Sequence, residues 1–219
     1  MIGPTLLDGP TSAQATGASP RSLVILLHGY GSNGADLIGL APYWRTVLPD
    51  TLFLAPNAPQ ACPGAPGGRQ WWPLTSLSPE ARAAGVRVAA PDLNTYIDSH
   101  LAAHGLSEDR LALVGFSQGT MMALHVGPRR AKPIAGIVGY SGMLADPDAL
   151  AQEAVTKPPV LLVHGDADEV LPVTAMHQAK TRLEALGLEV AAHVSPNLGH
   201  SVDEMGLQLG ASFLAKILA

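Results

Sequence analysis

The sequence predicts an α/β protein in which helices cover both faces of a mostly parallel sheet. The first observation behind this prediction is that apolar runs of strand length alternate with helical patterns along most of the chain. The second is that runs such as "LALVGF" (111–116) and "VLLVHG" (160–165) are apolar at consecutive positions rather than at every second one. Such strands are buried on both faces, as they are in a parallel sheet.

The same patterns place the strands and helices in chain order. Strands are expected at 22–28, 51–55, 110–116, 134–140, 159–164 and 188–194. Helices are expected at 34–47, 79–104, 118–128, 172–186 and 203–218. Because Pro91 has no amide hydrogen, it should kink or split the second of these helices.

Two segments fall outside this alternation. Residues 1–21 are expected to contribute a short edge strand at 5–8 and a mobile turn. Residues 56–78 read "PNAPQACPGAPGGRQWWPLTSLS", and irregular segments of this length are usually functional or disordered.

The composition predicts one domain spanning 1–219. With 219 residues, 47% of them hydrophobic, the chain is long enough for one sizeable core and short for two. The net charge is -5 and the 13 Lys and Arg are scattered, so we expect no nucleic-acid partner. No apolar run approaches the ~20 residues of a membrane span. The absence of a signal-peptide pattern and the single cysteine, Cys62, fit a cytoplasmic protein.

The first strand leads into "HGYGSNG" (28–34), which contains a G-x-G-x-x-G. In that position the motif can hold the pyrophosphate of a dinucleotide. A dinucleotide site also needs an acid at the carboxyl end of the next strand, about 20 residues on. That strand ends in Ala55, Pro56 and Asn57, and the nearby Asp50 precedes it. A nicotinamide enzyme is therefore a weak alternative, and no cofactor is expected.

A second glycine motif follows the strand at 110–116. Gly115-Phe116-Ser117-Gln118-Gly119 is a G-x-S-x-G between a strand and a helix, the pattern of a nucleophile elbow. We expect a Cβ at either glycine to crowd the tight packing of strand and helix. A serine hydroxyl is a weak nucleophile at neutral pH, so Ser117 needs a base and an acid that orients the base.

Acids and a histidine follow in the required order. The strand at 159–164 is followed by "DADE", which offers Asp166, Asp168 and Glu169 as acids. His200 lies in the loop between the last strand and the last helix, which gives the chain order Ser, Asp, His. His28 and His164 each precede a glycine at a strand end and are expected to brace loops. The other histidines fall on helical patterns or on a strand, where packing or solvation explains them: His100, His104, His125, His177 and His193.

The motifs "LLHGYGSNGADL", "GRQWWPL", "GFSQG", "YSGML", "HGDADEVLPV" and "GHSVD" together resemble the phospholipase/carboxylesterase family of small α/β-hydrolases. The resemblance covers 23–218 and implies an α/β-hydrolase fold without a large lid. It makes Ser117 the nucleophile, His200 the base and Asp168 the acid, with Asp166 bracing the loop. It also makes the backbone N–H groups of Tyr30 and Gln118 the oxyanion hole, so the glycines of 28–34 would serve an acyl oxyanion rather than a phosphate.

The resemblance further implies a substrate-binding wall made of Trp71, Trp72, Leu74, Met143 and Leu144. A structural explanation of Trp71 and Trp72, as anchors of the long loop, stays open at this point. No metal is expected. Dimers occur in the family, which leaves a homodimer open for this chain.

These residues predict a serine carboxylesterase that acts on small-molecule esters of short to medium acyl chains through an acyl-enzyme. An acyl-protein or acyl-CoA thioesterase, or a lysophospholipase, is the nearest alternative, because the same groups cleave these bonds. From a different class, a hydrolase-fold receptor could bind a ligand without turnover. Such receptors typically lose a catalytic residue, whereas the catalytic pattern is intact here.

Overall fold

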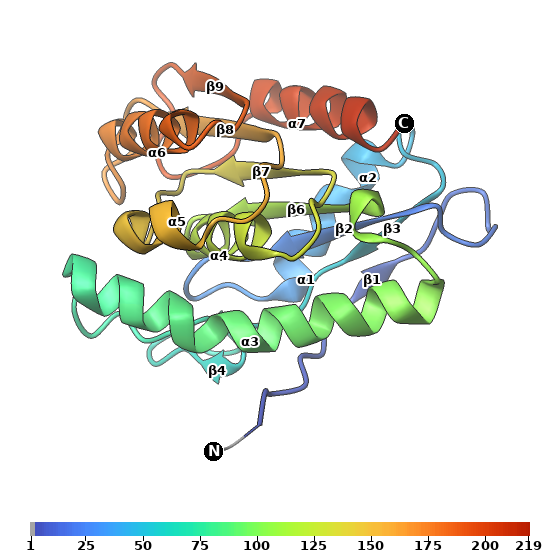
Figure 1. Cartoon of the computed structure of the whole chain (residues 1–219), viewed down its shortest axis with the longest axis horizontal. Coiled ribbons are helices and arrows are strands. Elements are labelled where there is room, and N and C mark those ends of the chain that lie inside the picture. The colour runs from blue at the N-terminus through green and yellow to red at the C-terminus, as the bar shows by residue number, and fades with distance from the viewer. Residues whose placement is uncertain (1–2) are drawn as a thin grey trace.

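A seven-stranded sheet of order β1-β3-β2-β6-β7-β8-β9 forms the centre of the molecule (Figure 1). The structure is a computed structural model that describes residues 3–219, so residues 1 and 2 of the segment 1–21 lie outside the described residues. β1 is antiparallel to β3, and the other neighbours in this sheet are parallel. The strands are β1 (Thr11–Ser12), β2 (Ser22–Leu27), β3 (Thr51–Leu54), β6 (Leu111–Phe116), β7 (Gly136–Tyr140), β8 (Val160–Gly165) and β9 (Val190–Ser195).

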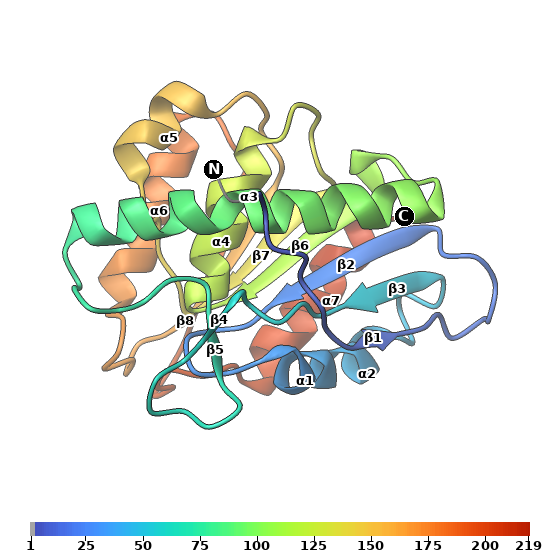
Figure 2. The ribbon, with the colours of Figure 1, turned by 90° about the horizontal axis from the view of Figure 1, so that it is seen from below.

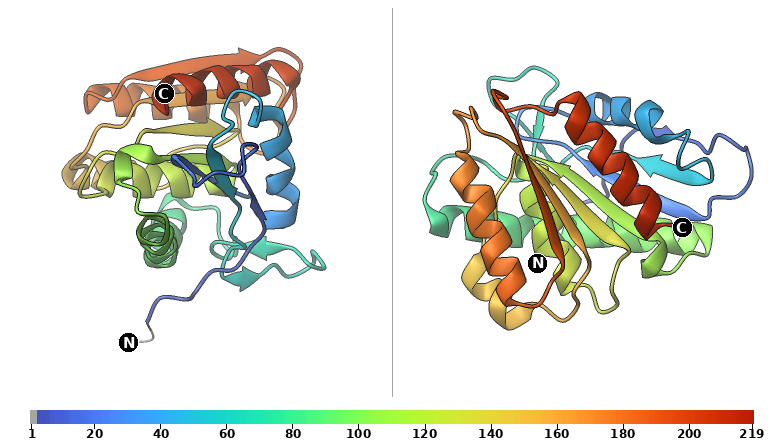
Figure 3. Two further views of the ribbon diagram at one scale, coloured as in Figure 1. Left: turned by 90° about the vertical axis from the view of Figure 1, so that its right-hand side faces the viewer. Right: turned by 90° about the horizontal axis from the view of Figure 1, so that it is seen from above.

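Helices lie on both faces of this sheet. Figure 2 shows α3, α4, α5 and α6 on one side and α1, α2 and α7 on the other. In the right-hand view of Figure 3 the edge strand β9 runs between α6 and α7. The helices are α1 (Gly34–Leu37), η1 (Ile38–Leu40), α2 (Ala41–Trp44), α3 (Pro79–His104), η2 (Glu108–Arg110), α4 (Gln118–Val126), η3 (Gly127–Arg129), α5 (Pro147–Glu153), α6 (Val173–Ala185) and α7 (Glu204–Ile217).

The sheet separates two apolar cores. In β2, Leu23, Ile25 and Leu27 pack into the core under α3, α4 and α6. Their neighbours Val24 and Leu26 pack into the core under α2 and α7. All five side chains are fully buried, which is why the strand is apolar at consecutive positions.

The α/β architecture and the strand positions are confirmed, with the central strands starting and ending within two residues of the expected bounds. The expected helix at 34–47 is instead divided into α1, η1 and α2, with Gly39 in the short 3₁₀ segment and Pro42 in the first turn of α2. Both residues disfavour a continuous helix. Helix α5 was not anticipated from the sequence, because seven residues give little helical periodicity.

Of the prediction that Pro91 kinks or splits its helix, the split is wrong. Helix α3 runs unbroken through Pro91, from the N-cap Ser78 to the left-handed Gly105. The proline ring removes the hydrogen bond to the carbonyl of Arg87, and both residues are exposed. Water can therefore hydrate the freed carbonyl, so the helix continues.

The prediction of an edge strand at 5–8 is also wrong in its position. The edge strand is β1, at Thr11–Ser12, and it pairs with β3. Hydrogen bonds continue this contact toward the amino terminus, from the Ala55 amide to the Pro10 carbonyl and from the Asn57 amide to the Asp8 carbonyl. The segment thus lies along the exit of β3, and its contact with the sheet is centred farther along the chain than 5–8.

The long segment 56–78 is held against the body of the protein. It contains a small antiparallel hairpin of β4 (Gln60–Ala61) and β5 (Arg69–Gln70). The guanidinium of Arg69 donates to the carbonyls of Ala58 and Pro59. The Gly31 amide donates to the Arg69 carbonyl and the Arg69 amide to the Ser32 carbonyl, which holds the segment beside the loop that follows β2.

Candidate active site

Ser117 occupies a strained turn between β6 and α4. Its φ of 54° and ψ of -115° lie in a region that residues with a Cβ seldom adopt. A Cβ on Gly119 would lie 1.9 Å from the Leu27 carbonyl oxygen, and one on Gly115 would lie 2.4 Å from the backbone of Gly119. The crowding expected at both glycines is confirmed. The turn is anchored by the Ser117 amide, which donates to the Tyr140 carbonyl at 2.9 Å.

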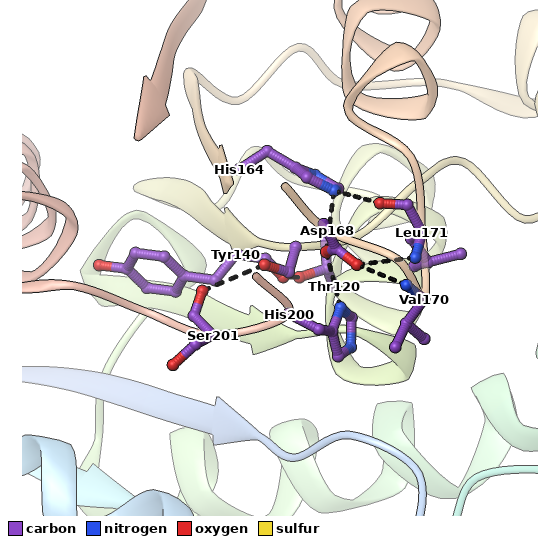
Figure 4. A network of polar contacts seen from close by, with 9 residues as sticks. Thr120, Tyr140, His164, Asp168, Val170, Leu171, His200 and Ser201 are labelled. Carbon is purple, nitrogen blue, oxygen red and sulfur yellow. Dashed lines mark hydrogen bonds and ion pairs between the residues drawn. The ribbon is translucent and has the colours of Figure 1, made fainter. Parts of the chain in front are cut away.

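Asp168 lies in the turn after β8, and its side chain is fully buried. One carboxylate oxygen accepts from the amides of Val170 (2.9 Å) and Leu171 (2.8 Å). The other lies 2.7 Å from Nδ1 of His200 and 3.2 Å from Nε2 of His164 (Figure 4). Burial opposes the charge, but the hydrogen bonds from Leu171, His200 and Val170 outweigh it and lower the pKa of Asp168. Asp168 is therefore an ionised carboxylate at neutral pH.

His164 supports this carboxylate from the side opposite His200. Its Nε2 faces two acceptors, the Asp168 carboxylate at 3.2 Å and the Leu171 carbonyl at 2.8 Å. Because both partners are acceptors, Nε2 carries the hydrogen. Its Nδ1 is buried without a hydrogen-bond partner in 3–219. The expected bracing role of His164 is thus confirmed, and the loop that it braces is the one that carries the acid.

His200 lies in the loop between β9 and α7, with 19% of its side chain exposed. Its ring packs against Phe116, with 4.9 Å between ring centroids, and Phe116 directly precedes Ser117. Asp166 accepts from the Asn197 amide at 2.6 Å and so holds the start of this loop. The structure therefore brings Asp168 and His200 together beside the turn that carries Ser117, and it places Asp166 in the bracing position.

The loop 28–34 lies against the same turn. A Cβ on Gly29 would lie 3.2 Å from the Cβ of Ser117, a tight contact that glycine avoids. His28 braces the loop, because its Nε2 accepts from the Ala58 amide at 3.0 Å, and burial lowers its pKa. Within 3–219, the amides of Tyr30 and Gln118 donate to no backbone carbonyl, which leaves both N–H groups free beside the elbow.

The third glycine of the G-x-G-x-x-G serves packing. A Cβ on Gly34 would lie 2.0 Å from the Ala55 carbonyl oxygen at the exit of β3. The helix that follows, α1, has only four residues. A nucleotide site of the dinucleotide type depends on a longer helix with its N-terminus at the phosphates, so this geometry disfavours it.

A cavity of about 470 Å³ opens beside Ser117. Of the residues predicted to bind substrate, Leu74 and Met143 line it, and Leu144 lines an adjoining cavity of about 450 Å³. The residues that line the cavity beside Ser117 are Tyr30, Leu74, Leu77, Arg82, Ser117, Gln118, Met121, Met143, Val170, Leu171, Pro172, Thr174, Ala175 and Gln178. The wall contributed by 170–178 and by Arg82 was not anticipated, because no motif marks it.

Trp71 and Trp72 are not among the residues that line this cavity. Trp71 is fully buried and Trp72 is 3% exposed. The side-chain amide of Gln118 accepts from the Trp71 amide and donates to the Trp72 carbonyl, both at 2.9 Å. The Trp71 indole donates to the His28 carbonyl at 3.0 Å. These contacts fit the structural explanation, in which the tryptophans anchor the long loop behind the site.

Residues 11–218 match the family model described as Phospholipase/Carboxylesterase. The chain belongs to this family. Among solved structures it is similar to esterase PE8, at 44% identity and a TM-score of 0.94, over 98% of this chain and 100% of that one. It is 25% identical over 194 residues to esterase YpfH of Escherichia coli (strain K12), which covers 89% of this chain and 82% of that protein. It is 32% identical over 176 residues to acyl-protein thioesterase 1 of Schizosaccharomyces pombe (strain 972 / ATCC 24843), which covers 76% and 77%.

As a member of the phospholipase/carboxylesterase family, the protein is an α/β-hydrolase of the esterase and thioesterase class. The resemblance inferred from its motifs is thereby confirmed. Within 3–219 no group of three or more His, Cys, Asp or Glu is arranged to hold a metal ion. The same residues include no helix that is both long and apolar enough to cross a bilayer.

Proposed function

We propose that this hydrolase is a serine carboxylesterase that cleaves short- to medium-chain esters through an acyl-enzyme intermediate. The observation that carries the proposal is the buried Asp168 carboxylate hydrogen-bonded to His200 beside the strained turn of Ser117. An ionised acid, an imidazole and a serine on a nucleophile elbow are the groups that acyl transfer to serine requires.

Asp168 determines which nitrogen of His200 is available. The carboxylate accepts the hydrogen on Nδ1, so the lone pair of the neutral imidazole lies on Nε2. In the first step Nε2 takes the proton of the Ser117 hydroxyl as the oxygen attacks the ester carbonyl. The protonated imidazole then gives this proton to the departing alcohol. Water repeats the sequence on the acyl-enzyme and releases the acid.

The free amides of Tyr30 and Gln118 are proposed to stabilise the oxyanion of the tetrahedral intermediates. Backbone donors fixed in this way are effective because they need no reorganisation as the charge develops. Gln118 is held in place by its side-chain contacts with the long loop, and Gly29 allows the Tyr30 segment to approach Ser117. Tyr30 contributes a backbone group, so its side chain is free to shape the rim of the cavity.

The cavity supports short to medium acyl chains. Its volume of about 470 Å³ is in the range of small-ligand sites, and Leu74 and Met143 give it apolar walls. Each methylene that enters it gains roughly 0.8 kcal/mol, and one that remains in water gains nothing. We propose a preference for about four to eight acyl carbons, and selectivity should stop rising once added methylenes remain in water.

Thioester hydrolysis is the second candidate, because relatives over most of this chain are named acyl-protein thioesterase 1. The same groups attack a thioester carbonyl, and the thiolate leaves more easily than an alkoxide. A lysophospholipase would use them as well. A receptor without turnover is disfavoured, because it has no need of a buried carboxylate aligned on an imidazole.

The test is the Ser117→Ala variant, with Ser212→Ala as matched control, since Ser212 is an exposed residue of α7 whose hydroxyl donates to its own helix. On p-nitrophenyl acetate, butanoate and octanoate, Ser117→Ala should lose about 10⁴-fold or more in kcat. Ser212→Ala should match the wild type. Hydrolysis of octanoyl-CoA, measured in parallel, compares the activity on a thioester with that on the esters. A fluorophosphonate should label the wild type on the peptide that contains Ser117. Activity of Ser117→Ala above a tenth of the wild-type activity would refute the proposal.

A further inference from the structure

The cavity beside Ser117 has one charged residue in its wall, Arg82. Most of the remaining lining is apolar, from Leu74, Met121, Met143 and Leu171 among others. Arg82 also lines the adjoining cavity, so this residue lies where the two cavities meet. A charge in an apolar wall raises the question of what it pairs with.

Among the residues that the structure describes, Arg82 has no carboxylate within ion-pair distance. One guanidinium nitrogen donates to the Leu77 carbonyl, whereas Nε is buried without any acceptor. Glu80 is not within ion-pair distance of Arg82, although hydrogen bonds from its own amide and Ser78, and then the charge of Arg82, lower the pKa of this exposed carboxylate. A buried donor without an acceptor costs free energy, so the Arg82 guanidinium is incompletely hydrogen-bonded in the free protein.

Arg82 occupies a position on α3 where the helix disfavours a cation. It lies in the first turns of the helix, after the N-cap Ser78, where the helix dipole disfavours positive charge. Arg87, farther along α3, gives the contrast, because it binds the carboxylates of Asp146 and Glu153 at 2.6 and 2.9 Å. Unlike Arg87, Arg82 is thus not paired with a carboxylate among the described residues and is available to bind a ligand.

The lining of the cavity indicates which part of the substrate it holds. Ser117 and both proposed oxyanion residues line it, and His200 does not. The leaving alcohol must lie against His200, because His200 gives it a proton. The cavity therefore holds the acyl part, and Arg82 lies on the acyl side of Ser117.

We propose that Arg82 binds an anionic group on the acyl chain, so that the preferred substrates are half-esters of dicarboxylic acids. This inference rests on the proposed function and names the substrate class of the same site. The free carboxylate of the substrate would accept from the guanidinium, while its esterified end lies at Ser117. Hydrolysis adds water and releases the alcohol and the dicarboxylate.

The test compares monomethyl adipate with methyl hexanoate, which has the same number of acyl carbons and no distal charge, by pH-stat titration. The variants are Arg82→Gln, Arg82→Lys and, as matched control, Arg182→Gln. Arg182 lines only the adjoining cavity and lies 3.8 Å from Asp148. For Arg82→Gln we expect the ratio of kcat/KM, half-ester over neutral ester, to fall about 10- to 100-fold, mainly through KM. Arg82→Lys should keep most of the ratio, and Arg182→Gln should leave it unchanged.

Two outcomes overturn the inference while ester turnover persists. The first is an unchanged kcat/KM ratio in Arg82→Gln. The second is an equal fall of this ratio in Arg182→Gln, which would mean that the positive charge of the surface, and not Arg82 itself, attracts the half-ester. A third arm uses the butanoyl ester of glycolate, whose anion is on the alcohol. If Arg82→Gln instead lowers kcat/KM for this ester, Arg82 binds an anion on the leaving group, and the inference is overturned. Loss of turnover on methyl hexanoate in the wild type would contradict the proposed function. Calorimetric titration with adipate still decides the role of Arg82 in that case, since Arg82→Gln should bind it at least about tenfold more weakly.

Discussion

Replacement of Asp168 by asparagine gives the sharpest test of the proposed catalytic residues, because the side chain keeps its shape while its hydrogen-bonding changes. The amide oxygen can still accept from Val170 and Leu171, the two backbone donors. The amide NH₂ then takes the place of the carboxylate oxygen that lies 2.7 Å from His200 Nδ1. An NH₂ group donates, so it selects the tautomer of His200 with its hydrogen on Nε2, which cannot accept the proton of Ser117.

The expected loss follows from this exchange. A wrong tautomer costs serine proteases roughly 10⁴ in kcat, which is about 5.5 kcal/mol of barrier. The new NH₂ also faces Nε2–H of His164, which the structure places 3.2 Å from that carboxylate oxygen. Two donors without an acceptor between them should lower the free energy of unfolding by about 1–3 kcal/mol. The variant should therefore be folded at 25 °C, with a reduced Tm and almost no activity.

Asp166→Asn is the matched control, since Asp166 lies two residues away in the same turn. Its bond to the Asn197 amide needs only an acceptor oxygen, which asparagine retains. Hydrolysis of p-nitrophenyl butanoate should change by less than about threefold, while urea denaturation reports any change in stability. If Asp166→Asn lost more kcat than Asp168→Asn, the assignment of the acid would be refuted.

Three further expectations follow from packing and burial. Gly115→Ala should lower the free energy of unfolding by about 3 kcal/mol or more, because its Cβ would lie 2.4 Å from the backbone of Gly119. In Gly39→Ala the new Cβ has nothing within 4 Å, so the free energy of unfolding should stay within about 1 kcal/mol of the wild type. Equal urea midpoints for the two variants would contradict this. Burial and the nearby Arg129 lower the pKa of His125 from 6.5 to about 4. The neutral imidazole therefore contributes its full share to the free energy of unfolding above pH 6.5, and this contribution is lost as the pH falls toward 4. Between pH 7.5 and 5 the wild type should lose roughly 2 kcal/mol that His125→Phe does not lose, and parallel urea curves would count against it. Met143→Ala should lower kcat/KM for the octanoate ester about tenfold more than for the acetate ester. Trp71→Ala should destabilise the fold and change kcat/KM for both esters equally. A larger loss on octanoate in Trp71→Ala than in Met143→Ala would place Trp71 in the acyl wall.

The parts that sequence alone could predict are those fixed by local chemistry. The G-x-S-x-G pattern placed Ser117 on a strand-to-helix turn, because only glycines tolerate the packing on either side of it. The spacing in "HGDADEVLPV" distinguished Asp168 from Asp166 only through family resemblance. The structure gives that choice a physical basis, since Asp168 is buried on His200 whereas Asp166 is exposed.

The parts that could not be predicted depend on what lies across the fold. Whether Pro91 breaks its helix depends on the exposure of the freed carbonyl, which no local pattern records. Trp71 resembled a pocket residue, but Gln118 fastens its backbone behind the site from 47 residues away in the chain. Arg82 belongs to no motif, and its interest comes from its place in the cavity wall without an ion-pair partner within 3–219.

The turn at 170–171 serves the acid and the cavity with different atoms. Its backbone amides donate to Asp168, while the side chains of Val170 and Leu171 line the acyl cavity. Directed evolution of acyl selectivity can therefore vary these side chains without removing either donor, because any residue except proline supplies the same amide. An insertion or deletion here would shift both amides away from the carboxylate. New specificities should thus arise at this turn by substitution, at constant loop length.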